Sequence, residues 1–377
     1  MQKPRIILCT GIDGKVNREK INKIIETSSY SSKVKFYNVG DYMHAAAQSF
    51  GRPVAKENLV NLPMEEQACY RNTACQDIKK EIENEQPEIA IVFTRSVYPR
   101  GIARDLEVMD KSHENIRPVF CINVIDDIQT MHENIKRDRR WANISQEKLL
   151  DWRGKELEVT EDYWFKPHKI PTYLLPVQEP SETLINLLFS NRKKVYLSYP
   201  ISHSLDEQKA KDKRDNFLKE LRKDFIVFDP LSIKEYKKAK ETNSPLIETI
   251  GDKTVSTDFK LISQCDLIVV YYPTEKIYVE TTKSVYEKSQ KTGILRLKSG
   301  DAICVELDEG ITLSAGVINE MVHAYNNGKM VYALWFSNET PSPFFSFHCR
   351  DTGGMLYQGS NAEEKFIKDI ENIKKAK

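Results

Sequence analysis

The sequence lacks the long apolar runs and closely spaced cysteines that mark membrane proteins, secreted proteins and zinc sites. No apolar stretch approaches the length that a helix needs to cross a bilayer. The segment Met1–Cys9 has no long apolar core of the kind found in signal peptides. The seven cysteines are odd in number and scattered, and several fall in apolar segments. We therefore expect a soluble cytoplasmic protein with reduced thiols and no metal site.

An excess of charge of either sign is also absent. The 377 residues carry 56 basic and 55 acidic side chains, a formal net charge of +1. This balance gives no electrostatic reason to expect nucleic acid or a membrane as a partner, although it is compatible with a local basic pocket for a phosphate. The length predicts two domains.

Short apolar segments alternate with longer amphipathic ones in both halves of the chain, which predicts βαβ units with parallel sheets. The pattern lapses across Asp151–Pro180, and we place the domain boundary near residue 191. The fold class is thus α/β, with two three-layer domains at 1–190 and 191–377. Expected strands are Arg5–Cys9, Val34–Val39, Glu88–Thr94, Pro118–Val124, Val195–Ser198, Phe225–Phe228, Asp266–Tyr272 and Met330–Phe336. Expected helices are Arg18–Ser28, Met64–Asn84, Asp206–Asp224, Thr254–Gln264, Ala315–Asn326 and Ala362–Lys377.

Two segments of the second half combine acidic and small residues in a recognisable spacing. In the first, Asp258 lies on an expected helix and Asp266 opens the strand that follows it. In the second, Ser314, Gly316 and Glu320 come at the start of another helix. Together with the strand Val195–Ser198, the loop Tyr199–Ser204 and Asp229-Pro230, these segments resemble the nucleoside 2-deoxyribosyltransferases. The resemblance to the 2'-deoxynucleoside 5'-phosphate N-hydrolases is closer still, and it covers about residues 193–336.

The resemblance implies a Rossmann-like domain that breaks an N-glycosidic bond. It makes Glu320 the nucleophile at C1' of the sugar and Asp258 the group that assists the leaving base. It makes Ser314 a contact of the 5'-phosphate, beside Gly316, where the backbone approaches the ligand. It further implies a small-molecule nucleotide or nucleoside substrate, no required cofactor, and a homo-oligomer. The remaining substrate-binding residues that it implies are Ser198, Tyr199, Asp229 and Asp266.

The chemistry accounts for these residue types. Cleavage of a C1'–N bond builds positive charge on the sugar, which a carboxylate stabilises or captures as a covalent glycosyl-enzyme. A helix N-terminus offers unpaired amides to a phosphate. Each residue also has an ordinary alternative: Glu320 and Asp258 as solvated surface charges, Ser314 as a helix cap, and Tyr199 as a side chain that fills the pocket. The segment 273–313, with an expected hairpin at Lys298–Asp301, is longer than the family leads us to expect.

The first half begins with a strand and a small loop, Thr10–Lys15, which is similar to a phosphate-binding loop. Gly11 and Gly14 are too close together for the complete motif, and Val16 has no hydroxyl for magnesium, although Lys15 is present. Tyr37–Met43 and the run Arg137–Arg140 add to a resemblance to P-loop nucleoside-monophosphate kinases with a degenerate cradle. Cations expected to form an anion site there, for ATP or another nucleotide, are Lys15, Arg95, Arg100, Arg137 and Arg140.

Three functions follow from these patterns. The first is an N-glycosidase or deoxyribosyltransferase-like enzyme that acts on a (deoxy)nucleotide or a related compound. The second is a non-catalytic nucleotide sensor or effector, for example in antiviral defence. The third is a nucleotide kinase, which the incomplete cradle disfavours because phosphoryl transfer needs both cradle and metal.

Overall fold

The computed structural model describes residues 3–12, 14–99, 105–200, 207–272, 278–282, 293–297, 302–307, 314–337 and 340–376. The described chain forms two compact units. Unit 1 is Met1–Leu188 with Ser232–Thr254, and unit 2 is Phe189–Leu231 with Val255–Lys377. Arg100 and most of the loop predicted after Val195–Ser198 lie outside the described residues. The segment Ser232–Thr254 thus belongs to unit 1, although it follows the predicted boundary near residue 191.

A five-stranded parallel sheet in the order β2-β3-β1-β6-β7 forms the centre of unit 1. All five residues of β3 are buried, as expected for a parallel strand covered on both faces. The strands of unit 1 are β1 (Arg5–Thr10), β2 (Val34–Asn38), β3 (Ile89–Phe93), β4 (Val97–Tyr98), β5 (Leu106–Glu107), β6 (Phe120–Ile125) and β7 (Thr172–Pro176). Its helices are α1 (Gly14–Glu26), α2 (Val39–Ser49), α3 (Met64–Glu85), α4 (Ile128–Ile135), α5 (Gln146–His168), α6 (Ser181–Phe189) and α8 (Glu235–Glu241).

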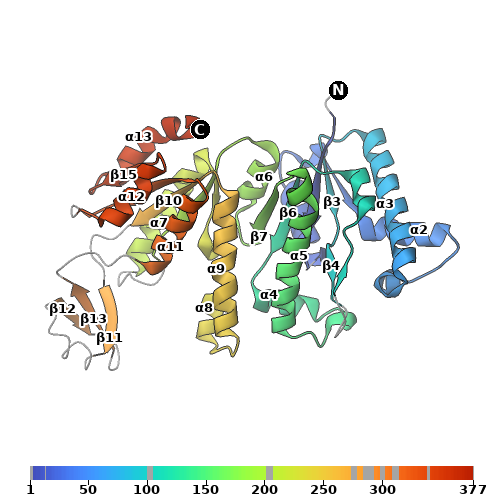
Figure 1. Ribbon diagram of the computed structural model, residues 1–377, viewed down its shortest axis with the longest axis horizontal. Helices are drawn as coiled ribbons and strands as arrows, with labels where there is room; N and C mark the ends of the chain where they lie inside the picture. Colours follow the sequence, from blue (N-terminus) through green and yellow to red (C-terminus); the bar gives the residue numbers. More distant parts are fainter. Residues whose placement is uncertain are drawn as a thin grey trace. The chain divides into compact units, whose positions relative to one another are not determined.

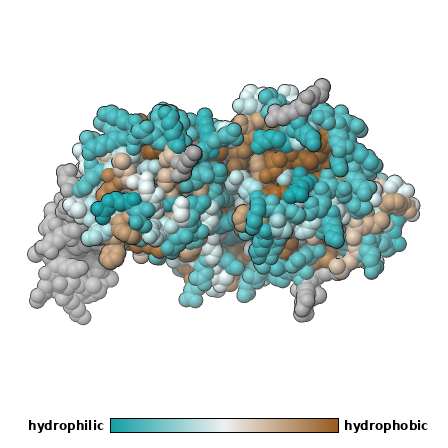
Figure 2. All heavy atoms as spheres, turned by 45° about the horizontal axis from the view of Figure 1, so that its top comes forward, coloured by the Kyte–Doolittle hydropathy of each residue, from teal (hydrophilic) through white to brown (hydrophobic). Residues whose placement is uncertain are grey.

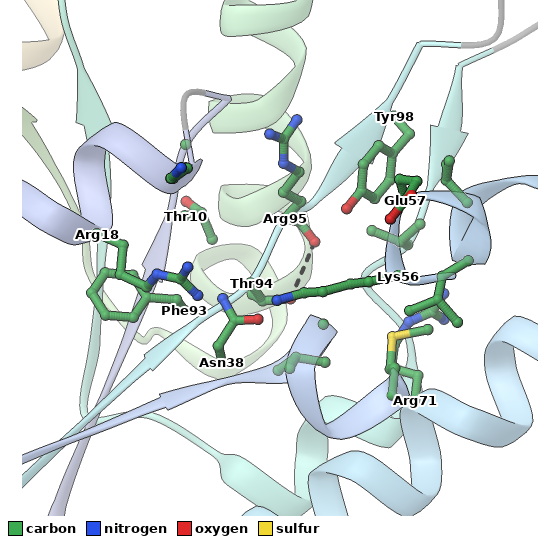
Figure 3. Close-up of a pocket in the computed structure, with 18 of the residues that line it drawn as sticks. Thr10, Arg18, Asn38, Lys56, Glu57, Arg71, Phe93, Thr94, Arg95 and Tyr98 are labelled. Carbon is green, nitrogen blue, oxygen red and sulfur yellow. Dashed lines mark hydrogen bonds between the residues drawn. The ribbon is translucent and has the colours of Figure 1, made fainter. Parts of the chain in front are cut away.

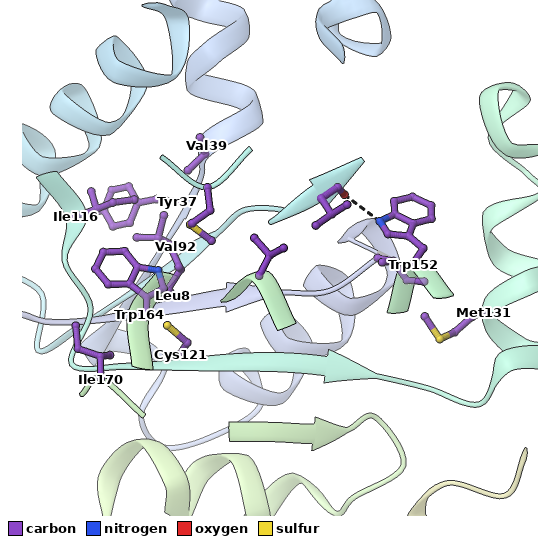
Figure 4. Close-up of a cluster of buried hydrophobic side chains, with 14 of the residues drawn as sticks. Leu8, Tyr37, Val39, Val92, Ile116, Cys121, Met131, Trp152, Trp164 and Ile170 are labelled. Atoms are coloured by element: carbon purple, nitrogen blue, oxygen red, sulfur yellow. Dashed lines mark hydrogen bonds between the residues drawn. The ribbon is translucent and has the colours of Figure 1, made fainter. Parts of the chain in front are cut away.

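Helices cover both faces of this sheet. On one face, α3 and α5 bury apolar side chains against Leu8, Val92 and Cys121 (Figure 4). Trp152 of α5 lies in this core, and its indole N–H donates to the carbonyl of Val97 at 2.9 Å. On the other face, α1 and α6 line a small cavity together with β6 and β7. Unit 1 is therefore a three-layer α/β structure (Figure 1).

A buried ion pair ties α8 to the rest of unit 1. Both terminal nitrogens of Arg153 donate to the Glu235 carboxylate, at 2.6 and 2.8 Å, and neither side chain is more than 7% exposed. Arg153 also donates to the carbonyl of Asp126. Because an unpaired charge at this depth is very unfavourable, the pair specifies where α8 docks.

Unit 2 has its own five-stranded parallel sheet, in the order β15-β14-β10-β8-β9. Its strands are β8 (Lys194–Ser198), β9 (Ile226–Phe228), β10 (Leu267–Tyr272), β14 (Met330–Trp335) and β15 (Leu356–Gln358), with a second sheet of β11 (Tyr278–Thr282), β12 (Gly293–Leu297) and β13 (Ala302–Leu307). Its helices are α7 (Glu207–Asp224), α11 (Ala315–Asn326), α12 (Pro343–Asp351) and α13 (Ala362–Lys375), and α9 (Ile247–Gln264) begins in unit 1 and ends in unit 2.

Alternate residues of the unit 2 strands face different helices. Val195, Leu197 and Val269 pack with α7 and α13 in one cluster. The residues between them point to the opposite face, where α11 and α12 contact β10 and β14 (Figure 1). This period of two places Tyr196 and Ser198 on the face that α11 covers.

The predicted interruption at Asp151–Pro180 is wrong, because α5 and β7 occupy most of it. Pro167 lies in the last turn of α5, where its missing N–H removes one helical hydrogen bond and the helix ends one residue later. The predicted hairpin at Lys298–Asp301 lies outside the described residues, but β12 and β13 on either side of it pair antiparallel, with Leu297 opposite Ile303.

In the part of the chain that is described, no helix has the length and apolar character needed to cross a membrane. The face shown in Figure 2 is mostly hydrophilic, with hydrophobic residues gathered in separate patches.

Candidate active site

Glu320 lies where β8 ends, held by two hydroxyl groups from that strand. The Tyr196 hydroxyl donates to Oε1 of Glu320 at 2.9 Å, and the Ser198 hydroxyl donates to Oε2. Tyr196 and Ser198 are two residues apart and so share one face of the sheet. Glu320 reaches them from the second turn of α11. The carboxyl edge of a parallel sheet is the usual place for ligands in such folds.

The electrostatics of this cluster give a carboxyl group that changes its protonation state near neutral pH. Burial raises the pKa of Glu320 to about 7, and the hydrogen bonds from Ser198 and Tyr196 oppose the rise without cancelling it. Burial raises the pKa of Tyr196 well above its ordinary value, and the charges of Glu320 and Asp258 add to the rise. The Tyr196 hydroxyl therefore stays protonated and remains a donor.

Asp258 lies on α9 close enough for its charge to act on the Tyr196 hydroxyl. The structure thus brings the two predicted acidic residues, Asp258 and Glu320, around one tyrosine. Tyr196 itself was absent from the predicted site. The signal for it was available, since it lies two residues before Ser198 in a predicted strand.

Ser314 stands at the start of α11 but does not cap it. It occupies the N-cap position, and its side chain makes no capping hydrogen bond. Its own N–H donates to the Tyr272 hydroxyl at 2.9 Å, which fixes the backbone at this point. Gly316 follows on an exposed part of the first turn. A Cβ added to Gly316 would meet the Ser314 hydroxyl only at 3.7 Å, so the protein itself does not require a glycine here.

Tyr199 and Asp229 bind each other, and Tyr199 belongs to the hydrophobic cluster that packs with α7 and α13. The Tyr199 hydroxyl donates to Asp229, and Tyr199 is only 5% exposed. The guanidinium of Arg214 lies over the Tyr199 ring, 4.8 Å from its centroid. Asp229 also accepts the N–H of Leu231 at 3.0 Å. Tyr199 is therefore a buried core residue of unit 2, and the predicted contact with a substrate stays a prediction.

Asp266 is not brought to this cluster. It directly precedes β10, at the opposite edge of the sheet from the end of β8. There it accepts the backbone N–H of Lys194 at 2.7 Å and forms an ion pair with the side-chain ammonium of the same residue. His323, on α11, stacks on Phe259 with ring centroids 4.2 Å apart and contacts the Ser263 hydroxyl, so it joins α11 to α9.

In unit 1, only part of the predicted anion site lines a cavity. Gly11, Lys15 and Arg140 line it, as does Arg95 (Figure 3). Gly14 begins α1, and Arg137 is an exposed residue that is not among the described residues lining this space. The predictions missed Arg18, Lys56 and Arg71, whose spacing in the sequence carries no common motif.

The loop after β1 differs from a phosphate cradle in what its backbone binds. The N–H of Gly11 donates to Glu156 of α5 at 3.3 Å, and the same carboxylate accepts the N–H groups of Ser96 and Val97 at 2.7 and 2.8 Å. Gly11 has φ +143°, and a Cβ there would lie 2.6 Å from the carbonyl oxygen of Val124. Position 11 thus requires a glycine, both for the close contact with Val124 and for the positive φ.

The described residues contain no group of three or more histidine, cysteine or acidic side chains able to hold a metal ion.

No protein-family model and no curated protein sequence matches this chain. A solved structure described as the CMP N-glycosidase BcmB of Clostridium botulinum is similar at 14% identity and a TM-score of 0.26, over 48% of this chain and 99% of that one. A similarity of this size identifies neither the fold nor the activity, so the α/β assignment comes from the two parallel sheets.

Proposed function

We propose that unit 2 cleaves the N-glycosidic bond of a (deoxy)nucleotide or a related compound, releasing the base or transferring the sugar. The observation that carries this proposal is the Glu320 carboxyl group, which two hydroxyls orient at the carboxyl edge of the sheet and whose pKa is about 7. A surface glutamate would have neither feature, because solvation keeps its charge stable and its side chain free to rotate.

Glu320 has the properties that attack at C1' requires. Its ionised form would attack the sugar carbon as the C1'–N bond breaks, which gives a glycosyl-enzyme and the free base. Water or an acceptor base then attacks C1', the bond to Glu320 breaks, and the carboxylate is restored. The Tyr196 and Ser198 hydroxyls orient the carboxylate throughout. Asp258, close to Tyr196, is the candidate that supplies a proton or hydrogen bond to the leaving base.

The start of α11 supports a substrate that carries a phosphate. Ser314 leaves its hydroxyl out of the helix cap, and the amides of the first turn have no helical carbonyl partners. A phosphate placed there would receive these donors and the favourable end of the helix dipole. Ser314 would thus bind the 5'-phosphate, while Glu320 in the second turn of α11 acts on C1' of the same molecule.

The proposal is tested by incubating the protein with a panel of ribo- and deoxyribonucleotides and measuring free base by chromatography. Glu320→Gln keeps the shape of the side chain and removes the nucleophile, so base release is expected to fall by at least about a thousandfold. The matched control is Asp266→Asn, an acid in the same unit at the other edge of the sheet, which is expected to retain activity. Equal rates for the parent and Glu320→Gln would refute the proposal.

A second variant tests where the phosphate binds. Gly316→Ala fits the protein, since the added carbon meets the Ser314 hydroxyl at an ordinary 3.7 Å. Its folding stability should therefore be close to that of the parent. If the phosphate approaches this turn, the methyl group raises KM for nucleotides much more than for the matching nucleosides. An equal effect on both would place the phosphate elsewhere.

A further inference from the structure

A cavity of about 390 Å³ opens in unit 1 where β1, β2 and β3 end (Figure 3). This volume is in the range of pockets that hold small organic ligands. Its walls come from the ends of these strands, the start of α2 and the segment Lys56–Asn61. The reaction proposed for unit 2 gives this space no role.

Positive charge dominates the walls of the cavity. Among the described lining residues, the only acidic ones are Glu57 and Asp138. Arg18 and Lys56 share a single carboxylate, that of Asp41. The basic side chains are Lys15, Arg18, Lys56, Arg71, Arg95 and Arg140.

Two of these cations make no direct ion pair in the part of the chain that is described, although the charge of Arg95 acts on the carboxyl groups of Glu156 and Asp138. Arg71 pairs with Asp110 and Arg140 with Asp138, but within the described chain Lys15 and Arg95 form no ion pair. The positive charges also act on one another. Burial lowers the pKa of Lys56, and the charge of Arg18 lowers it further. An anion in the cavity would relieve this repulsion.

Arg95 lines the cavity and has unused hydrogen-bonding capacity. Its guanidinium lies over the rings of Tyr98 and Trp152, 5.2 and 5.1 Å from their centroids, which holds the planar group in place. Its Nη1 atom is buried and has no hydrogen-bond partner among the described residues. A buried donor without a partner is costly, and arginine suits phosphate oxygens in particular.

Part of the lining is apolar. Met43, Leu59 and Val60 line the cavity, and Leu59 belongs to a separate hydrophobic cluster on which Met43 packs. Inorganic phosphate alone would leave these apolar side chains in contact with water. The complementary ligand therefore combines an anionic group with an apolar body.

The backbone of the loop after β1 indicates how much phosphate fits. In a P-loop, successive amides of this segment surround a chain of phosphates. Here the Gly11 amide is already bound to Glu156, so side-chain cations provide the binding. We propose that this cavity binds an organic phosphate monoester, with its phosphate on Arg95, Lys15 and Arg18 and its organic part against Met43 and Leu59. This site stands independently of the reaction proposed for unit 2.

Calorimetric titration of the full chain tests this site. All proteins carry Glu320→Gln so that no ligand is consumed, and the probes are AMP, ribose 5-phosphate, inorganic phosphate and ATP. One of the two monoesters is expected to bind at least about tenfold more tightly than inorganic phosphate and ATP. The stronger of them identifies the organic part as a nucleoside or as a sugar alone.

Variants assign the binding to this cavity rather than to unit 2. Arg95→Met is expected to weaken the monoester about 10- to 100-fold, as the loss of a hydrogen bond to a charged group does. Lys15→Ala, an exposed change that leaves the fold intact, should weaken it in the same direction. Arg137→Met, an exposed arginine of unit 1 not among the lining residues, is the matched control and should bind as the parent does.

Three results would overturn the proposal. The first is that neither monoester binds better than inorganic phosphate. The second is unchanged binding in both Arg95→Met and Lys15→Ala. The third is an equal loss in Arg137→Met, which would show a general effect of charge.

Discussion

Replacing Glu320 by glutamine is expected to abolish base release and, at alkaline pH, to stabilise unit 2. The ionised carboxylate is disfavoured in the folded protein, because burial raises its pKa to about 7 from 4.5. Glutamine carries no charge to bury. Its oxygen accepts from one of the hydroxyls of Tyr196 and Ser198, and its amide donates to the other.

The size of the effect follows from linkage. A rise from 4.5 to about 7 corresponds to about 3 kcal/mol between the two protonation states. Between these pH values the folded protein holds a proton that the unfolded chain has lost, so the parent loses stability as pH rises from about 4.5 to 7. Because Glu320 is only half-buried, solvent reduces the cost, and we expect about 1 to 3 kcal/mol.

Urea unfolding of the parent and of Glu320→Gln at pH 5 and pH 8 measures this. Between pH 5 and pH 8, the unfolding free energy of Glu320→Gln should increase relative to that of the parent by this amount, roughly 1 to 3 kcal/mol. Glu364→Gln removes an exposed carboxylate from α13 and serves as the control, with little change expected between the two pH values. If the unfolding free energy of Glu320→Gln exceeds that of the parent by the same amount at both pH values, the conclusion that the ionised Glu320 is destabilised in the folded protein is refuted.

Two further changes test the hydrogen bonds and the backbone. Tyr196→Phe removes a donor to the ionised form of Glu320, so the midpoint of the pH dependence of kcat/KM should rise above about 7, by about one pH unit. An unmoved midpoint would mean that Tyr196 does not act on Glu320 in solution. Gly11→Ala requires φ +143° and places a carbon 2.6 Å from the Val124 carbonyl oxygen, so unit 1 should lose about 2 kcal/mol or more. Gly51→Ala, at φ +73° in open space, is the matched control and should cost less in thermal unfolding; equal losses would contradict the close contact at Gly11.

Most strands and several helices could be predicted because their burial is nearly complete and their residues are apolar. All six residues of β10 are buried, and the predicted bounds differ from it by one residue. The helix α5 was missed for a physical reason. Its buried positions include Arg153 and Glu156, which interrupt the apolar pattern. Their partners lie far away in the sequence, at Glu235 and at the loops after β1 and β3, so no local pattern reveals that these charges are satisfied.

The candidate sites also combine features that could be predicted from the sequence with features that could not. The spacing of Ser314, Gly316 and Glu320 within the first two turns of one helix is local, and it could be recognised in the sequence. The cavity of unit 1 is not local, because its cations come from α1, α3, the end of β3 and the segment around Lys56. Asp266 shows the opposite error, since a residue next to a site motif in the sequence lies at the far edge of the sheet.

The sequence by itself determined that this chain forms α/β structure and that Glu320 stands on a helix, since both depend on periodicity over a few residues. The tertiary structure decided what surrounds that carboxyl group. The register of β8 places Tyr196 and Ser198 beneath α11. Their hydroxyls hold the carboxyl group of Glu320 in one orientation, while the loss of water raises its pKa to about 7 against the opposing effect of these hydrogen bonds. Burial and orientation are properties of residues that meet only when the sheet has formed.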